Sequence, residues 1–239
     1  MKKTLLTLSL PFLAFGSVQA SEWGYDDAQL GPAHWGSIAQ DCAMTKNQSP
    51  INIEQSTVAS LDNLSVSYLG RVIGFTNNGH TLQAQVDGQN TLTIDGKTFE
   101  LQQFHFHTPS ENLIKSRQYP LEAHFVHAND EGELAVISVM FDEGNSNRAL
   151  SQLISHIPAK DNTDFFSDGF SINELLPDST HYYRFNGSLT TPPCSEGVRW
   201  FVLKDSLPLS KEQASKFMDS MGRNNRPLQP LNARVVLSK

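Results

Sequence analysis

Apolar and polar residues alternate with a period of two along several stretches of the chain, which is the pattern of β-strands with one buried face. Asn-Gly and Asp-Gly pairs at 78–79, 87–88 and 95–96, and the polar stretch 129–132, mark short turns between these runs. Links this short favour antiparallel pairing of successive strands. Strands are predicted over 64–69, 71–77, 81–86, 91–94, 98–107, 121–128, 134–141, 198–203 and 233–237, with a shorter one entered from a turn at 48–53.

Helical spacing of apolar residues occurs in two stretches. In 147–157, leucines and isoleucines recur at the helical period, Ser146 is the candidate N-cap and Pro158 ends the helix. In 211–221, apolar residues line one face after the candidate cap Ser210. Residues 21–50 have no sustained period and are expected to form an ordered but irregular arm. The predicted class is therefore mostly β, a mixed α+β fold of mainly antiparallel strands with a few peripheral helices.

The first twenty residues have the organisation of a secretory signal peptide. Lys2 and Lys3 precede an apolar run over 4–15, and Val18-Gln19-Ala20 supplies a small-residue cleavage site. The run is too short to span a bilayer, and no later stretch is long enough, so no membrane anchor is expected. We therefore predict a signal peptide over 1–20, cleavage near Ala20, and one domain over 21–239, located in the periplasm or secreted.

Charge and cysteine count narrow the picture further. The formal net charge is −7, loss of the two leader lysines makes it more negative, and no basic run occurs, which argues against nucleic acid and anionic membranes as partners. The two cysteines, Cys42 and Cys194, suggest a disulfide in an exported protein. Zinc-binding thiolates are the alternative, but no C-x-x-C spacing supports them. A bond closing so long a loop contributes about 5 kcal/mol in the chain-entropy model.

The predicted strand 98–107 ends in Gln103-Phe104-His105-Phe106-His107. Side chains at i and i+2 share a face of a strand, so His105 and His107 project together, opposite Phe104 and Phe106. Two such imidazoles on a rigid strand can bind one metal ion. Histidines that pack in the core or lie on the surface are the alternative for this pair.

His124 is the third candidate ligand. In 121–128, Glu122, His124 and Val126 share one face, whereas His127 lies on the other and is interpreted as structural. If this strand pairs antiparallel with 98–107 through a loop at 108–120, His124 lies across from the histidine pair. Three imidazoles with one open position are typical of a catalytic zinc site, and Glu122 can accept the second ring N–H of a ligand.

The stretch 186–200 combines hydroxyl residues and two prolines with Cys194, as expected of a shaped loop. With this stretch included, the chain resembles the α-class carbonic anhydrases of exported bacterial type. The matching segments appear in the family's order and extend from about Trp23 to Val236: 23–25, 48–51, 77–80, 103–107, 122–124, 187–193 and 225–230.

The resemblance implies one Zn²⁺ per chain, held by His105, His107 and His124, and reversible hydration of CO2 to bicarbonate and a proton by attack of zinc-bound hydroxide. Zinc lowers the pKa of its bound water to about 7, a value established on carbonic anhydrases themselves. Thr190 and Glu111 match the pair that orients the hydroxide. A threonine that must donate to a carboxylate can only accept from the hydroxide.

The resemblance assigns further positions. His80, in the segment 77–80, matches the proton shuttle of the family. An imidazole suits that role because it titrates in the required range. Gln103 and Glu122 match the partners of the ligand histidines. The water path would be lined by Tyr25, Asn78 and Gln83, and the substrate position by Thr191 with the apolar wall Val126, Val136, Leu189, Val198 and Trp200.

Two departures from the family pattern, and two alternatives, accompany this interpretation. Phe185 stands where many members have a tyrosine near Tyr25, and the short link from His107 makes the position of Glu111 depend on the alignment. Inhibition by sulfonamides and small anions is implied, and the oligomeric state stays open, with a homodimer as one alternative. A non-catalytic binding module would characteristically lose a ligand histidine, and none is lost here. A zinc hydrolase of activated esters is the other alternative, at least as a side activity.

Overall fold

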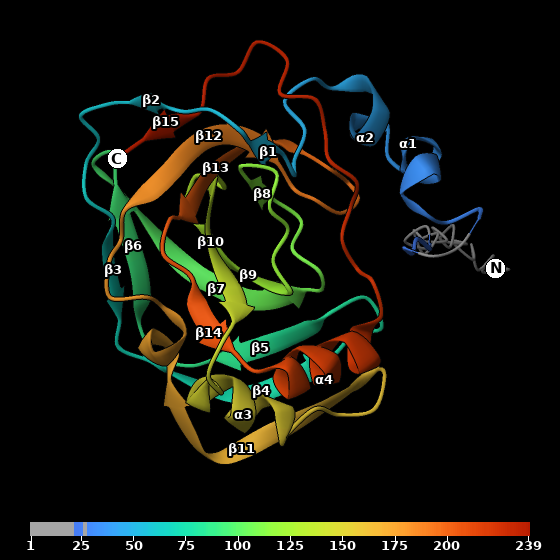
Figure 1. Ribbon diagram of the computed structural model, residues 1–239, viewed down its shortest axis with the longest axis vertical. Coiled ribbons are helices and arrows are strands. Elements are labelled where there is room, and N and C mark those ends of the chain that lie inside the picture. The colour runs from blue at the N-terminus through green and yellow to red at the C-terminus, as the bar shows by residue number, and fades with distance from the viewer. Residues whose placement is uncertain (1–21, 26–27) are drawn as a thin grey trace, which may run out of the picture.

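A 13-stranded twisted sheet forms the body of the molecule in the computed structural model, which describes residues 22–25 and 28–239 (Figure 1). The predicted signal peptide over 1–20 lies outside the described residues. The sheet confirms the predicted class. Its strand order is β11 (Asn162–Ser171), β4 (Arg71–Asn77), β5 (Leu82–Val86), β7 (Lys97–His107), β9 (Leu121–Ala128), β10 (Leu134–Glu143), β13 (Glu196–Leu203), β12 (Tyr182–Ser188), β15 (Leu237–Ser238) and β2 (Thr57–Val58).

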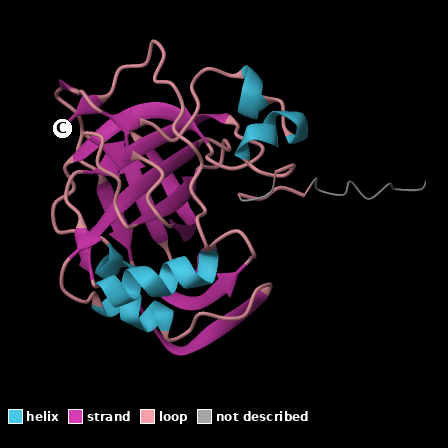
Figure 2. Ribbon diagram, turned by 45° about the vertical axis from the view of Figure 1, so that its right-hand side comes forward, coloured by secondary structure: helices cyan, strands magenta, loops and turns pink. Residues whose placement is uncertain are grey.

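Shorter elements complete the sheet and surround it. Most neighbouring strands are antiparallel, but β10 runs parallel to β13, and β15 runs parallel to β2. In Figure 2 the helices lie at the periphery, with α3 and α4 together at one end of the sheet and α1 and α2 beside its upper part. The remaining elements are β3 (Ser65–Tyr68), β6 (Asn90–Ile94), β14 (Leu207–Leu209), the separate pair β1 (Asn52–Ile53) and β8 (Leu113–Ile114), the helices α1 (Trp35–Ile38), α2 (Asp41–Met44), α3 (Arg148–Ile154) and α4 (Lys211–Met221), and the 3-10 turns η1 (Pro32–His34) and η2 (Ile172–Leu175).

Several predicted elements agree with the structure residue for residue. β4, β9 and α4 have the predicted bounds, and Ser210 caps α4 in a capping box with Gln213. The helix predicted over 147–157 is shorter, Arg148–Ile154, and its cap is Asn147 rather than Ser146, because the Asn147 side chain accepts from the Leu150 N–H at 3.1 Å.

Other expectations were wrong. The strand predicted over 233–237 is only Leu237–Ser238, paired with Arg184 and Tyr183 of β12. The predicted loop 186–200 begins and ends in strand, so its irregular part is 189–195. The arm over 21–50 contains the short helices α1 and α2 as well as irregular chain. The long strand β11 was not predicted because its exposed edge position leaves almost no apolar alternation, with Phe170 its one buried residue.

The two faces of β7 have different chemistry, as its alternation predicts. Phe104 and Phe106 are fully buried in the larger apolar core, where Phe104 stacks on Phe125 and Phe106 contacts Phe217 of α4 at ring distances of 4.8 and 4.9 Å. A second, smaller apolar cluster includes Val136 of β10 and Val198 and Trp200 of β13. The aromatic anchors fix β7, and so they fix the direction in which His105 and His107 project.

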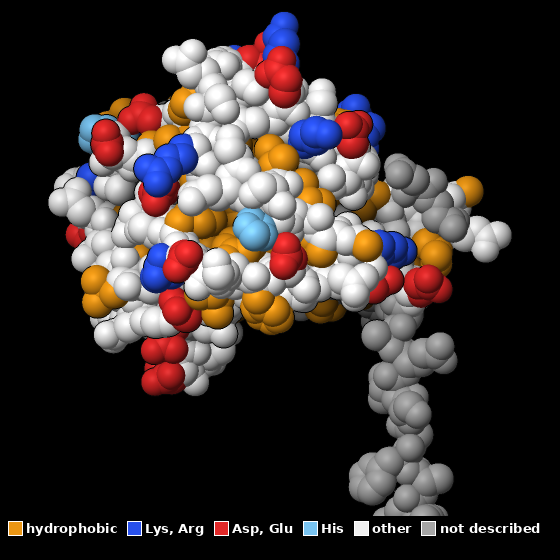
Figure 3. Space-filling view, turned by 90° about the horizontal axis from the view of Figure 1, so that it is seen from below, with side chains coloured by type: hydrophobic (Ala, Val, Ile, Leu, Met, Phe, Trp, Pro, Cys, Tyr) orange, Lys and Arg blue, Asp and Glu red, His pale blue; other side chains and the backbone are white. Residues whose placement is uncertain are grey.

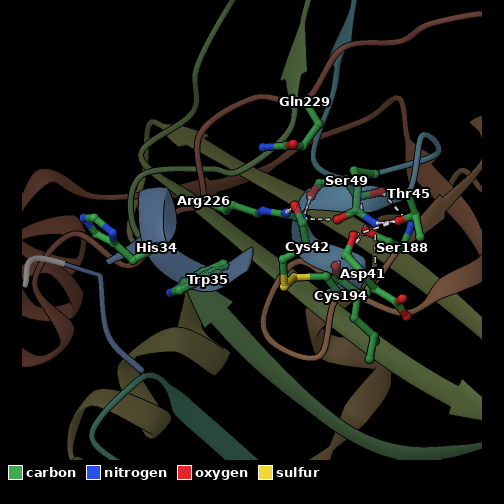
Figure 4. Close-up of a disulfide and its surroundings, with 12 residues drawn as sticks. His34, Trp35, Asp41, Cys42, Thr45, Ser49, Ser188, Cys194, Arg226 and Gln229 are labelled. Carbon is green, nitrogen blue, oxygen red and sulfur yellow. Dashed lines mark hydrogen bonds between the residues drawn. A yellow bond between two sulfur atoms is a disulfide. The ribbon is translucent and has the colours of Figure 1, made fainter. Parts of the chain in front are cut away.

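The predicted disulfide is confirmed. Cys42 and Cys194 are bonded with their Cα atoms 5.0 Å apart, and they join the N-terminal arm to the loop before β13 (Figure 4). Hydrogen bonds reinforce this junction: the Gln48 side-chain amide donates to the Cys194 carbonyl at 2.9 Å, and the Ser49 N–H donates to the Ser188 hydroxyl at 2.9 Å. The loop at 189–195 is therefore held at both the covalent and the polar level.

The outer surface mixes charges of both signs. On the side of the molecule seen in Figure 3, acidic and basic side chains alternate with apolar ones and do not segregate into fields of one sign. Within the described part of the chain, none of the helices has the length and apolar character that crossing a membrane requires.

Loss of the disulfide is expected to destabilise the fold. Cys42→Ser removes a link between residues 152 apart in sequence and should lower the free energy of unfolding by about 2–5 kcal/mol. Urea unfolding measures the change. The double variant Cys42→Ser/Cys194→Ser is the control, since a reducing agent should destabilise the natural chain and leave this variant unaffected. Equal urea midpoints for the natural and double-variant chains would contradict the prediction.

Candidate metal centre

Three histidines from two paired strands converge on one point. β7 and β9 are antiparallel in a register that places His105 directly across from His124, with His107 two residues further along β7. One ring nitrogen from each lies within 4.8 Å of the other two, and no other such group of potential metal ligands occurs among the described residues. The predicted pairing through the loop 108–120 is therefore confirmed in its geometry.

The other ring nitrogen of each histidine is engaged by a different acceptor. His105 Nδ1 donates to the Gln103 side-chain oxygen, His107 Nδ1 to the Asn224 main-chain carbonyl, and His124 Nε2 to Glu122 Oε1, each at 2.8 Å. These bonds set the ring orientation and leave Nε2 of His105 and His107 and Nδ1 of His124 to face one another.

Burial favours the neutral imidazole of His105 and of His107, which is the form that binds metal. Burial, followed by the neighbouring His107 and His124, holds the pKa of His105 well below its usual range. Burial also lowers the pKa of His107, although its bond to the Asn224 carbonyl opposes this.

Glu122 is a fully buried carboxylate that accepts five hydrogen bonds. Its donors are His124 Nε2, the Ser138 hydroxyl at 2.6 Å, the Asn112 side-chain amide at 2.8 Å, and the main-chain N–H groups of Glu111 and Asn112 at 2.7 and 2.9 Å. Burial alone would raise the pKa of Glu122. The charge and hydrogen bond of His124, with the bonds from Ser138 and Asn112, outweigh burial and hold this pKa at about 2.

The donor set fits a bound cation. His107 Nε2 is buried and has no hydrogen-bond partner among the described residues, and the same is true of Glu111 Oε2, which lies 3.5 Å from it. Buried polar atoms are rarely left unpaired. Three imidazole nitrogens that face one another, one of them unpartnered, match the ligand set of a zinc site with an open position.

Glu111 lies beside the three histidines. Its Oε1 accepts from the Arg226 main-chain N–H at 2.8 Å. Burial raises the pKa of Glu111 to about 7, while His124, the Arg226 N–H and the Thr190 side chain act to lower it. Thr190 is itself buried and its side chain influences the pKa of Glu111, so the two residues lie near each other beside His107.

The apolar residues of the predicted wall form a row on the metal side of the sheet. The strand registers align Val126 of β9 with Val136 of β10, and Val136 with Trp200 of β13. The Trp200 ring packs edge-on against His124 at a centroid distance of 4.8 Å. Val198 belongs to the same apolar cluster, and Leu189 packs against it.

A cleft of about 140 Å³ opens beside the histidines. The predicted residues that line it are Tyr25, Asn78, His80, Gln83, Gln103, His105, His107 and Thr191. A wider outer pocket of about 400 Å³ adjoins it and shares Trp23, Tyr25, Asn78 and His80 with it. His80 therefore lies at the boundary between the cleft and the outer pocket.

The surroundings of His80 are partly apolar and partly charged. Its ring stacks on Trp23 at a centroid distance of 4.0 Å, and Lys160, Asp161 and Glu22 line the outer pocket. Burial lowers the pKa of His80 and Lys160 lowers it further, against the raising effects of Asp161 and Glu22.

Several residues of the site were not predicted. Trp23 and Thr81 line the cleft, Ser138 and Asn112 bond to Glu122, and Asn224 bonds to His107. No periodicity marks these residues, and only the folded chain brings them together. His127 is structural, as interpreted: it is buried and bonded to the Tyr68 hydroxyl at 2.6 Å.

Phe185, at the position where the resemblance implied a tyrosine in many members, is buried and stacks parallel to Trp200 at 6.0 Å. It belongs to the apolar cluster and does not line the cleft.

Known proteins resemble the chain over nearly its whole length. A family model described as eukaryotic-type carbonic anhydrase matches residues 30–239. A carbonic anhydrase of Pectobacterium carotovorum is 48% identical over 97% of this chain and 96% of its own. The structure of the Photobacterium profundum alpha-carbonic anhydrase has a TM-score of 0.88 and 57% identity over 90% of this chain and all of that one. That of alpha-carbonic anhydrase from Thermovibrio ammonificans, in complex with the inhibitor sulfanilamide, has a TM-score of 0.87 and 43% identity over 90% of this chain and 98% of that one.

Glu122→Gln is expected to weaken zinc binding by about 10–100-fold, as is usual for the partners of metal ligands. The amide would turn N–H groups toward donors that now point at a carboxylate, and so disturb the orientation of His124. Competition with a chelator at fixed pH measures the affinity. Gln103→Ala removes only the partner of His105 and gives a milder second case, and Glu100→Gln, an exposed change on β7, is the matched control. Equal zinc affinities for all four proteins would refute the role of these bonds.

Proposed function

This chain belongs to the eukaryotic-type, or α, carbonic anhydrase family and is a carbonic anhydrase, and on that premise we propose that it hydrates CO2 reversibly to bicarbonate and a proton with one zinc ion per chain. The observation that carries the proposal is the convergence of His105, His107 and His124, with one ring nitrogen of each within 4.8 Å of the other two. A relative that had become a non-catalytic binding module would be expected to lack one of them.

His105, His107 and His124 would hold the ion, and the acceptors behind them keep each ring in the tautomer that a metal requires. When bound, zinc supplies hydroxide near neutral pH by lowering the pKa of a water molecule to about 7, an effect for which carbonic anhydrases are themselves the reference case. The unpartnered His107 Nε2 supports this assignment from the side of the protein.

Thr190 and Glu111 would set the direction of attack. The Thr190 side chain lowers the pKa of Glu111, as a hydroxyl that donates to the carboxylate does. A hydroxyl whose proton is used in this way has only lone pairs to offer to a second partner. Thr190 would therefore accept a hydrogen bond from a donor, such as hydroxide, at the metal position. The Arg226 main-chain N–H fixes the Glu111 carboxyl in place for this purpose.

The apolar wall would receive the substrate. CO2 has no net dipole, so a surface of valine, leucine and tryptophan side chains next to the metal is a suitable receptor. We assign this role to Val126, Val136, Leu189, Val198 and Trp200, with Thr191 at the substrate position. A cleft of about 140 Å³ suits a triatomic substrate better than a large acyl group, so turnover of activated esters is expected only as a side activity.

His80 would carry the proton from the cleft to solvent. It borders both the cleft and the outer pocket, and an unperturbed imidazole titrates near neutral pH, from which burial lowers the pKa of His80. Tyr25, Asn78 and Gln83 line the same cleft as His80, His105 and His107, which suits them to order water along the path.

The disulfide supports a location outside the cytoplasm, and a relative supports a class of inhibitor. A disulfide-bonded chain belongs outside the reducing cytoplasm, so we propose that residues 1–20 direct export, that cleavage near Ala20 releases a catalytic domain over 21–239, and that this domain acts in the periplasm or is secreted. The sulfanilamide complex of the Thermovibrio ammonificans protein supports inhibition by sulfonamides, and small anions are expected to compete for the same position. Nucleic acid and membrane are not expected partners, and a homodimer is one assembly to test.

His105→Ala is expected to abolish zinc binding and CO2 hydration together, since two imidazoles leave the site without its full ligand set. Metal analysis and stopped-flow CO2 hydration on the purified mature chain measure both. His34→Ala, at an exposed histidine of the arm, is the control and should keep both. A His105→Ala protein that is metal-free and fully active would refute the proposal.

His80→Ala is expected to slow turnover by about 10-fold or more in weak buffer, because general acid–base groups typically contribute at least ~10²-fold and solvent can replace only part of that. Added imidazole should restore part of the rate by carrying the proton itself. Hydration rates with and without imidazole test this, and His156→Ala is the control for loss of a histidine outside the cleft. An unchanged rate in weak buffer would remove His80 from the mechanism.

A further inference from the structure

We propose that the Asn224 side chain is a positioning residue that ties the turn carrying His80 to the metal-bearing strand β7. The inference rests on the proposed function, because it gives a role to the distance between the proton shuttle and the metal. It concerns the side-chain amide of Asn224, which is separate from the main-chain carbonyl that partners His107.

The main chain of Asn224 is committed to β7. Its carbonyl accepts from His107 Nδ1 at 2.8 Å, and its N–H donates to the Thr108 carbonyl at 3.2 Å. Asn224 is completely buried and follows the end of α4 by three residues. Its backbone position is therefore fixed by the end of the strand that holds two of the three candidate ligands.

The Asn224 side chain makes three further hydrogen bonds to main-chain groups. Nδ2 donates to the His80 carbonyl at 3.1 Å and to the Phe106 carbonyl at 2.9 Å, and Oδ1 accepts from the Thr108 N–H at 2.7 Å. Two carbonyls and one N–H require a group with two donors and an acceptor, which in a short side chain is the amide of asparagine. Aspartate would place a carboxylate against both carbonyls.

The His80 turn is held from outside by the pairing of β5 with β7, which places Gln83 across from His105, and by side-chain bonds of Asn224 and Thr81. Within the turn, the Asn78 side-chain oxygen accepts from the His80 and Thr81 N–H groups at 3.0 and 2.9 Å, and Gly79 adopts a φ of +82°. These bonds shape the turn but do not attach it to the histidine cluster. Together with the strand pairing, the Asn224 bond to the His80 carbonyl and the Thr81 hydroxyl bond to the Phe106 carbonyl, at 2.6 Å, make that attachment.

One residue therefore joins the two chemical tasks. A continuous path runs from the His80 carbonyl through the Asn224 amide to its own carbonyl and then to His107. If the amide sets the position of His80, its loss should affect proton transfer more than ligand binding, because the main-chain bond to His107 survives a change of side chain.

Asn224→Asp and Asn224→Ala test the inference. Aspartate keeps the Oδ1 acceptor for the Thr108 N–H and removes the donor to the His80 carbonyl, whereas alanine removes both. Asn90→Ala is the matched control because Asn90 is also buried but does not line the cleft. Its side chain also bonds to three main-chain groups, the Gly70 N–H at 2.9 Å and the Asp87 and Gly88 carbonyls at 2.7 and 3.3 Å.

The expected result is a split between two kinetic constants. For CO2 hydration in weak buffer, kcat includes return of the proton to solvent, whereas kcat/KM includes only the steps up to departure of bicarbonate. Both Asn224 variants should lower kcat by about 10-fold or more, as small misplacements of catalytic groups do, with kcat/KM within about threefold of the natural value. Imidazole should restore part of kcat, and Asn90→Ala should keep the natural ratio of the two constants.

A readout that needs neither zinc nor turnover accompanies the kinetics. In the metal-free protein, amide hydrogen exchange at His80 and Thr81 should accelerate in the Asn224 variants and stay unchanged in Asn90→Ala. Natural exchange rates at both amides, or parallel falls of kcat and kcat/KM without rescue by imidazole, would overturn the inference. Failure of the natural zinc-loaded chain to hydrate CO2 would instead overturn the proposed function, and the exchange experiment would still decide whether Asn224 holds the turn.

Discussion

The site depends on one buried carboxylate. Glu122 is removed from water and accepts five hydrogen bonds, so its ionised form is stabilised and its pKa stays at about 2. Such an anion cannot move without leaving several donors unpaired inside the protein, which is far more costly than the loss of an exposed bond. Because one of its donors is His124 and another is the Glu111 N–H, the same anion fixes the third histidine and the segment that carries the second carboxylate.

The sheet distributes the two kinds of chemistry by its two-residue period. On β7, aromatic rings fill one face and imidazoles the other, so that the interlocked core of Phe104 and Phe106 gives His105 and His107 a rigid base. The loop with Thr190 has no such packed core behind it, and the N-terminal arm supports it instead. The disulfide bonds that loop to the arm (Figure 4). The Gln48 side chain donates to the Cys194 carbonyl, and the Arg226 guanidinium donates to the Gln48 side chain and the Ser49 carbonyl, which fixes the arm beside the loop.

The sequence supported those parts of the prediction in which local pattern and tertiary environment agree. α4 was predicted to the residue because its buried residues, Gln213 and Phe217, are four apart and Ser210 caps it. β4 and β9 were predicted to the residue from their sequence patterns, although β9 is buried on both faces. The same period placed His105, His107, Glu122 and His124 on common faces before any contact was known. β11 was missed because an exposed edge strand needs little apolar alternation. Asn224 could not be found at all, since its role is a set of bonds to groups more than a hundred residues away.

Charge balance connects the two buried carboxylates to the ion that the histidines would hold. Glu122 is ionised, whereas burial raises the pKa of Glu111 to about 7, so the metal-free site resists a second negative charge. Burial lowers the pKa of His105 and His107, so these two imidazoles contribute little compensating charge of their own. A divalent cation would offset both carboxylates and leave the enclosed site without net charge, which is the condition under which buried ions are tolerated. The histidines would therefore supply the ligands of the proposed ion, and the carboxylates behind them make a doubly charged ion the electrostatically suitable one.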